Sequence, residues 1–266
     1  MNITFVGGGV VTRHTARLHA ARGDVVHVVS PRPCDVPGLW TIGDAVSGRG
    51  VRRAMRGADV VVWTASTQDD IEEFYALGTR NTANAARQEG ARLVLCGPRG
   101  AHQGSRSRSL RAWSSASEDC HEIVPELTEL RLPALFARDG HLGGPWLEAV
   151  AAGRAIRVAD PGARLAPLWA GDAARAVSSA IRGELAVGIY SVRGPEEVVM
   201  GQLAELVASA AGGRVGVIPP FSRRAEDLAR LDDQLAEHDD WNALGCGDRK
   251  TLSQWLEDVL GPTTPN

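Results

Sequence analysis

Residues 5–14, FVGGGVVTRH, decide the fold that this chain of 266 residues is expected to adopt. An apolar run, NITFV, leads into the glycines and predicts a buried strand, and residues 10–23 have the periodicity of a helix. Gly7, Gly9 and Thr12 occupy the three positions of G-x-G-x-x-G, whose first two glycines let a pyrophosphate approach the helix N-terminus. Thr12 replaces the third glycine, which normally allows close packing of helix and strand. The turn predicts a dinucleotide site, with a glycine-rich turn that binds nothing as the alternative.

The first half of the chain alternates apolar runs with helix-patterned segments. Residues 24–30, 59–66 and 91–97 read as further strands, and residues 69–90 have the length and period of a full helix. Strands separated by helices of this length indicate right-handed crossovers. We therefore predict the α/β class: a doubly wound parallel sheet (Rossmann fold) with a small C-terminal substrate lobe.

The chain shows no internal repeat and no composition break that marks a linker. We therefore treat residues 1–266 as a single Rossmann-like unit. Residues 1–130 are expected to be mainly the dinucleotide-binding core, and residues 131–266 to mix core and substrate lobe. In addition, residues 117–129 are predicted to be helical, residues 129–136 to form a strand, and the polar residues 219–241 to form a solvated helix.

Composition excludes several classes of partner. The net charge is −3 and the isoelectric point is near 6.2, which gives no electrostatic reason to expect nucleic acid or an anionic membrane. No apolar run is long enough to span a bilayer, and the N-terminus has no charged leader, so a cytoplasmic location is expected. The four cysteines form no C-x-x-C pair, which argues against a metal site and against a disulfide framework: Cys34, Cys96, Cys120 and Cys246.

The end of the second predicted strand bears on which dinucleotide is bound. An acidic residue there would accept hydrogen bonds from the ribose hydroxyls of NAD, but the sequence is VVSPRP. Ser30 and Arg32 could instead meet a 2′-phosphate, which favours NADP over NAD. The alternative is that Arg32 is a solvated turn residue.

The order of these motifs resembles a known family. The chain is similar to the extended and atypical short-chain dehydrogenases/reductases, the group of the NAD-dependent epimerases/dehydratases and their NmrA-like relatives. The likeness runs along nearly the whole chain, and its later signatures are LRLPALFARDGHLGGP, PLWAGDAARAVSSAI, GIYSVRGPEEV and LGCGDRKTLSQWLEDVL. The resemblance implies that NAD or NADP is bound, with Asp44 near the adenine and Ala65, after the third strand, also on the cofactor. It further implies a small-molecule substrate and a homodimer formed through the helices that carry Tyr75 and follow Ser117.

The chemistry of this family uses a tyrosine as general acid/base, a lysine four residues later, and a serine or threonine after the fourth strand. Laid on this chain, the pattern puts Ser114 at the tyrosine, Glu118 at the lysine and Pro98 near the hydroxyl residue. A glutamate in place of the lysine would raise, not lower, the pKa of a nearby phenol. Hydride transfer by the usual route is therefore not expected, and no other tyrosine–lysine pair of this spacing exists among the remaining candidates: Tyr75, Tyr190 and Lys250.

Other groups could replace the missing pair. Glu118 and His121, with Ser114, are the candidate acid/base residues, because carboxylates and histidines do such work when burial shifts their pKa values. The alternative is an acidic, solvated helical turn that complements the helix dipole. Neighbouring loops could add polar or aromatic groups to the pocket: Cys96, His102, Trp113, Arg138, Asp139, His141 and Trp146.

Three functions stay open at this point. The first is an NAD(P)-binding enzyme that acts on a small organic molecule, for example a secondary metabolite, by dehydration, isomerisation, cyclisation or epimerisation. The second is a redox-silent sensor or regulatory protein of the NmrA-like kind. The third is an enzyme in which the dinucleotide site is vestigial. A nucleotide-sugar substrate is not favoured, because Arg164 stands one position away from the arginine that sugar-nucleotide members use.

Overall fold

The structure is a computed structural model that describes residues 1–266 except 68, 141, 159, 218–234, 236 and 261–266. Seven strands form the central sheet in the order β12-β6-β5-β4-β1-β2-β3, and every neighbouring pair is parallel. This order confirms the predicted doubly wound sheet. The strands are β1 (Asn2–Val6), β2 (Val25–Ser30), β3 (Leu39–Ile42), β4 (Val60–Trp63), β5 (Arg92–Pro98), β6 (Thr128–Leu132) and β12 (Gly188–Ser191).

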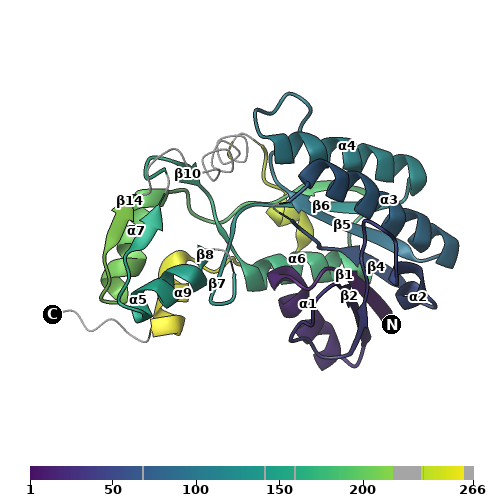
Figure 1. Ribbon diagram of the computed structural model, residues 1–266, viewed down its shortest axis with the longest axis horizontal. Helices are drawn as coiled ribbons and strands as arrows, with labels where there is room; N and C mark the ends of the chain where they lie inside the picture. The colour runs from purple at the N-terminus through teal and green to yellow at the C-terminus, as the bar shows by residue number, and fades with distance from the viewer. Residues whose placement is uncertain (68, 141, 159, 218–234, 236, 261–266) are drawn as a thin grey trace.

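Helices cover both faces of this sheet (Figure 1). One face carries α1 packed on α6, and the other carries α2, α3 and α4, with α3 packed closely along α4. Each face has its own hydrophobic core, one around Trp63, Tyr75 and Trp113 and the other around Phe5 and Val177. The helices are α1 (Val10–Ala21), α2 (Val51–Met55), α3 (Ile71–Glu89), α4 (Arg108–Ile123) and α6 (Ala170–Arg182).

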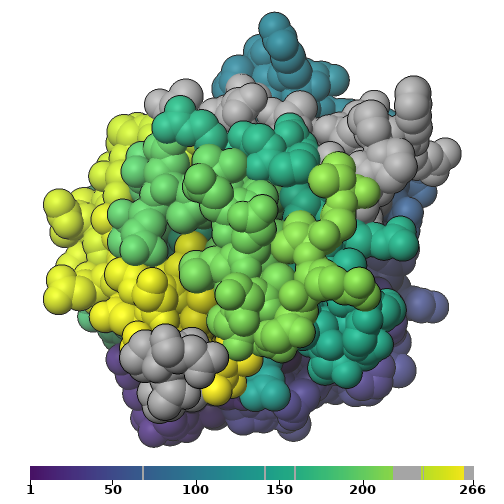
Figure 2. Space-filling model, turned by 90° about the vertical axis from the view of Figure 1, so that its left-hand side faces the viewer, coloured from purple at the N-terminus to yellow at the C-terminus, as the bar shows by residue number. Residues whose placement is uncertain are grey.

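A smaller lobe with a third core lies beyond the carboxyl ends of the strands (Figure 1). Seen from that end, α7 and α9, drawn green and yellow, lie side by side at the surface (Figure 2). The lobe contains β7 (Leu135–Ala137), β8 (Leu142–Gly143), α5 (Gly144–Ala151), β9 (Ile156–Val158), β10 (Arg164–Leu165), β11 (Leu168–Trp169), β13 (Val198–Val199), α7 (Met200–Ala210), β14 (Val215–Val217) and α9 (Leu252–Leu260). A short 3-10 helix, η1 (Trp241–Leu244), packs through Trp241 and Leu244 on the core of the large sheet.

The predicted helix at residues 117–129 is wrong in its boundaries. The helix is α4, which ends at Ile123, and Thr128–Leu132 is strand β6. The strand predicted to begin at Glu129 begins one residue earlier, and Pro125, which disfavours a helical conformation for the residue before it, lies just after the end of the helix. Most of the predicted helix at residues 219–241 lies outside the described residues, as does His141.

No described helix combines the length and the apolar character that crossing a bilayer requires.

Candidate functional site

The glycine-rich turn joins β1 to α1 next to β4, where the strand order reverses. Gly7 has φ of 111°, and a Cβ built on it would lie 2.6 Å from the backbone nitrogen of Ala65. Both the left-handed backbone and the contact with β4 therefore require glycine here. Ala65 thus lies against the turn, although it follows it by more than fifty residues in the chain.

Thr12 stands where the motif has its third glycine. The side chain is fully buried, and its hydroxyl lies 2.7 Å from the carbonyl oxygen of Gly7 and 2.5 Å from the hydroxyl of Thr64. These bonds tie the first turn of α1 to the ends of β1 and β4. Thr12 is therefore an internal support of the turn.

Gly9 differs from Gly7 in a way that matters for ligand binding. Its φ is −72°, which any residue can adopt, and a Cβ built on it would meet nothing within 4 Å. Gly9 is also the N-cap of α1, and no side chain caps the helix there. The first N–H groups of a helix form a natural anion site when no side chain occupies them. The open end of α1 fits a pyrophosphate.

The predicted ribose residues lie beside this turn, but the hydroxyl of Ser30 already has hydrogen-bond partners within the chain. Its hydroxyl donates to the carbonyl oxygen of Arg32 (2.6 Å) and accepts from Nε1 of Trp40 (3.0 Å). Arg32 is exposed. The side chain of Cys34 packs against Gly8, where a Cβ would lie 2.9 Å from that of Cys34.

Asp44 lies after β3 and organises its own turn. Its carboxylate accepts hydrogen bonds from the backbone N–H of Val46 and the hydroxyl of Ser47, both at 2.9 Å. Asn81 of α3 donates to the carbonyl oxygens of Ala45 and Val46 and so holds the same turn. The turn is preformed, and the adenine contact of Asp44 stays a prediction.

Two of the candidate acid/base residues meet on α4. The hydroxyl of Ser114 donates to Glu118 Oε1 (3.3 Å), which also accepts a bond from Gln103 (3.2 Å). Ser114 is buried and Glu118 is exposed. Gln103 belongs to the loop after β5, so Glu118 lies beside the segment that leaves the carboxyl end of that strand.

The third candidate, His121, points to a residue that the sequence analysis did not single out. Its Nε2 lies 3.5 Å from a carboxylate oxygen of Glu129, on β6, whose side chain is fully buried. Trp113 Nε1 and Arg131 Nε each donate to that carboxylate at 2.9 Å, and the Ser117 hydroxyl also donates to it. Glu129 and Arg131, two positions apart in a strand, share a face, and this spacing is the signal that could have found the pair.

Glu129 is held ionised in the core. Burial raises the pKa of this carboxyl, but the contact with His121 at 3.5 Å, the charge of Arg131 and the bonds from Ser117 and Trp113 outweigh burial and lower its pKa to about 2. A carboxylate in this state is a fixed acceptor at neutral pH and does not exchange protons there. Glu129 is therefore a positioning group.

The carboxyl end of β5 carries no hydroxyl side chain. Gly97 and Pro98 end the strand, and a Cβ on Gly97 would overlap the indole of Trp113. Tyr75, on α3, is buried edge-on against that indole with ring centroids 5.2 Å apart. Lys250, by contrast, pairs with Asp258 and lies 4.3 Å above the ring of Trp169. The phenol of Tyr75 and the ammonium of Lys250 thus lie in different parts of the molecule.

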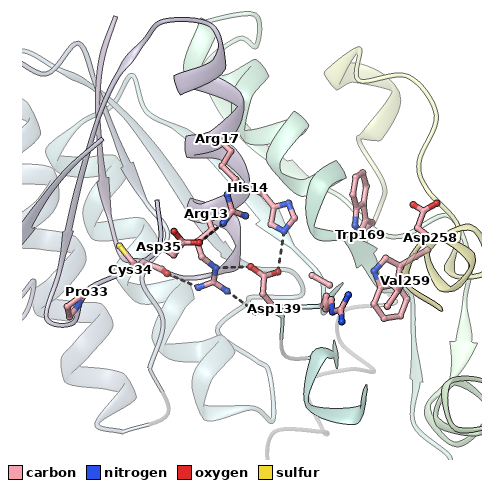
Figure 3. A pocket seen from close by; sticks show the side chains of 14 residues that line it. Arg13, His14, Arg17, Pro33, Cys34, Asp35, Asp139, Trp169, Asp258 and Val259 are labelled. Atoms are coloured by element: carbon pink, nitrogen blue, oxygen red, sulfur yellow. Dashed lines mark hydrogen bonds and ion pairs between the residues drawn. The ribbon is translucent and has the colours of Figure 1, made fainter. Parts of the chain in front are cut away.

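A groove of about 740 Å³ flanks the glycine-rich turn between α1 and the small lobe (Figure 3). Arg13 spans it, because its guanidinium donates to the carbonyl oxygen of Gly8 (3.1 Å) and to the carboxylate of Asp139 (2.8 Å). His14 lies 3.3 Å from the same carboxylate. Burial raises the pKa of Asp139, but the bonds to Arg13 and His14 outweigh burial and lower it. Asp139 thus links the small lobe to the turn, and Arg138 lines the same groove.

The chain matches no protein-family model, and no curated protein matches it in sequence. Solved structures match it well in fold. A nucleoside-diphosphate-sugar epimerase from Staphylococcus aureus has a TM-score of 0.74 at 19% identity, covering 97% of this chain and 100% of its own. Pal from Bacillus thuringiensis has a TM-score of 0.75 at 11% identity over the same shares of the two chains.

A third similar structure contains a dinucleotide. It is the UDP-glucose 4-epimerase of Thermus thermophilus in complex with NAD, with a TM-score of 0.70 at 20% identity, covering 90% of this chain and 100% of its own. Identities this low define the fold alone. The chain therefore shares the Rossmann fold of these structures, which confirms the predicted fold and, at the level of fold, the resemblance. The bound dinucleotide named for structures of this fold is NAD, and the predicted preference for NADP finds no support there.

Proposed function

We propose that this chain binds a dinucleotide at the open end of α1 and acts on a small organic molecule by chemistry that does not use the phenol–ammonium couple. The observation that carries the proposal is Gly9. Its backbone does not need glycine and nothing in the chain fills the space beside it, so a ligand explains the missing side chain better than the fold does. Similar structures that contain NAD support the same site.

Different residues would hold the pyrophosphate, the ribose and the adenine of the dinucleotide. The N–H groups at the start of α1 would bind the pyrophosphate, since no acidic residue in the first turn opposes it. Gly7 and Ala65 close the floor of the site, and Thr12 holds the turn in shape. The ribose and adenine would lie towards Ser30, Arg32 and Asp44. When bound, the nicotinamide supplies hydride chemistry, but no phenol of this chain is placed to move the accompanying proton.

The substitution Gly9→Asp tests the site. An aspartate at an N-cap bonds the first N–H groups of a helix and complements its dipole, so the free energy of unfolding should rise by about 0.5 kcal/mol. The same carboxylate would occupy the pyrophosphate position and repel it. NAD and NADP affinity, measured by calorimetry, should therefore fall at least about tenfold.

Gly162→Asp is the matched control, because Gly162 is an exposed glycine of the small lobe with an ordinary φ. It adds the same charge away from the turn and should leave dinucleotide affinity unchanged. Equal affinities of the wild-type and Gly9→Asp proteins, or no binding by the wild type, would rule out the proposed site.

A redox-silent dinucleotide sensor is the second candidate, and one observation favours it. The groups around the carboxyl end of β5 are bonded to one another: Trp113 covers Gly97 and donates to Glu129, whose carboxylate is fully buried. A sensor should bind oxidised and reduced dinucleotide with different affinities, whereas an enzyme need not. Parallel titrations with NAD and NADH, and with NADP and NADPH, decide between the two functions.

A further inference from the structure

A second polar site lies at the carboxyl ends of β5, β6 and β12. The strand register places Gly97, Arg131 and Ser191 side by side across the three strands. Arg99 follows β5 directly and is fully buried, as is Ser191. Ligands of open α/β sheets bind outside these strand ends. The position of the polar groups is therefore that of a ligand site.

These groups form a cradle for an anion, and the chain fills the cradle with the side chain of Glu237. One oxygen of its carboxylate accepts hydrogen bonds from the backbone N–H of Gly100 (2.8 Å) and the hydroxyl of Ser191 (2.6 Å). The other accepts from Arg131 Nη1 at 3.1 Å. Arg99 donates to the Ser191 hydroxyl at 2.8 Å and to the backbone carbonyl of Glu237. Backbone, hydroxyl and guanidinium donors converging on one carboxylate are the donor set by which proteins recognise carboxylates and phosphates.

The Glu237 carboxylate supplies negative charge to both guanidinium groups of the cradle, those of Arg99 and Arg131. Glu129 lies on the far side of Arg131 and is already bonded to Trp113 and other groups of α4. Removing the Glu237 carboxylate would take one negative charge away from two largely buried guanidinium groups, and an external anion could restore it.

Among the described residues, the carboxylates of Asp239 and Asp240 also act on Arg99, but both have other partners. Asp239 pairs with Arg249 at 2.6 Å, and Asp240 accepts a hydrogen bond from the backbone N–H of Ser191. The Glu237 side chain is 19% exposed and belongs to no described helix or strand. It could therefore leave the cradle without removing an element of the fold.

We infer that the cradle of Gly100, Ser191 and Arg131 binds the carboxylate or phosphate of a small acidic ligand, and that Glu237 is its built-in competitor. If the anion is a substrate, the inference rests on the proposed function and adds that the substrate is acidic. Anion binding itself does not depend on the dinucleotide, because none of the residues that form the cradle belongs to the turn from Gly7 to Thr12.

The test is Glu237→Gln, which keeps the shape of the side chain and removes its charge. The melting temperatures of the full-length variant and the wild type are measured with 10 mM acetate or inorganic phosphate, against chloride at equal ionic strength. An uncharged glutamine should compete less well for the donors than the carboxylate, so a millimolar anion site should raise the melting temperature of the variant by about 3 °C more than that of the wild type. A rise with acetate alone assigns the site to carboxylates, and a rise with phosphate assigns it to phosphorylated ligands.

Glu184→Gln is the matched control, since Glu184 forms an exposed ion pair with Arg182 remote from the cradle. Adding Ser191→Ala to Glu237→Gln should remove most of the extra rise, because one donor is lost. If Glu237→Gln does not fold, Glu237→Asp replaces it. The shorter side chain keeps the charge but holds it farther from the donors, so anions should raise the melting temperature of this variant by a smaller amount.

The inference is overturned if neither Glu237 variant responds to anions more than Glu184→Gln, or if the Ser191→Ala addition leaves the response intact. NAD titration of Glu237→Gln should match the wild type, so a failed anion test leaves the dinucleotide proposal standing, and the reverse is also true.

Discussion

The open end of α1 and the buried carboxylate of Glu129 lie on opposite faces of the same sheet. They differ in whether their polar groups have partners within the chain. At Gly9 the helix N-terminus has no capping side chain and faces open space. At Glu129 four side chains surround one carboxylate that is fully buried. A helix end that faces open space without a cap is available to a ligand, whereas the groups around Glu129, which are buried and bonded to one another, stabilise the fold. The glycine-rich turn therefore has an open polar end, and the α4–β6 contact is a structural support.

The largest effect is expected from removing the buried carboxylate. Glu129→Ala would leave Arg131 and the donors of α4 without their shared acceptor, and should lower the free energy of unfolding by about 4 kcal/mol. Urea denaturation measures the loss. If Glu129→Ala unfolds at the same urea concentration as the wild type, Glu129 is not a structural support and the contrast between the two regions does not hold.

Acid should remove the same contribution without a mutation. The pKa of Glu129 is about 2 in the folded chain, below its ordinary value of 4.5, so the unfolded chain binds the proton more readily. The stabilisation is complete above pH 4.5 and is lost as the pH falls towards 2, by on the order of 3 kcal/mol. Burial raises the pKa of Glu237 but its hydrogen bonds outweigh this and lower it, so Glu237 contributes in the same direction. The difference between the acid titrations of wild type and Glu129→Gln therefore isolates Glu129; parallel curves would contradict the assignment.

A smaller effect should separate the two glycines of the turn. Gly7→Ala forces a side chain into a left-handed backbone and towards the backbone of Ala65, and should cost about 2–3 kcal/mol of stability. Gly9→Ser, its control, adds an N-cap hydroxyl in open space and should change stability by less than about 0.5 kcal/mol. Thermal unfolding of both variants gives the comparison, and equal losses would mean that Gly9 too is required by the fold.

The smallest structural effect is expected at Glu118. Its carboxylate is exposed and makes only long hydrogen bonds to Gln103 and Ser114, so Glu118→Gln should change stability by less than about 0.5 kcal/mol. The variant nevertheless tests chemistry. Turnover of a substrate, once one is found, should fall in Glu118→Gln if this carboxylate moves a proton, and unchanged turnover removes it from the mechanism.

Much of the fold could be predicted because its signals are local. The runs around Val28, Val62 and Leu95 are apolar over the length of a strand, and the helices between them have a clear period. The glycine-rich turn was predictable for the same reason, since its three motif positions lie within six residues. The boundary between α4 and β6 was missed although Pro125, which disfavours a helical conformation for the residue before it, lies between Ile123 and Thr128.

The sequence by itself determined the doubly wound sheet, the turn at Gly7 to Thr12 and the absence of a tyrosine–lysine pair of the usual spacing. These depend on which residues are present and how they are spaced along the chain. Only the tertiary structure decided that Gly7 is required by Ala65 while Gly9 is free of contacts, and that Glu129 gathers Trp113 and Arg131 around one charge. The physical reason is that burial and hydrogen bonding join groups far apart in the chain, and a residue's role depends on which of its polar atoms those contacts leave unpaired.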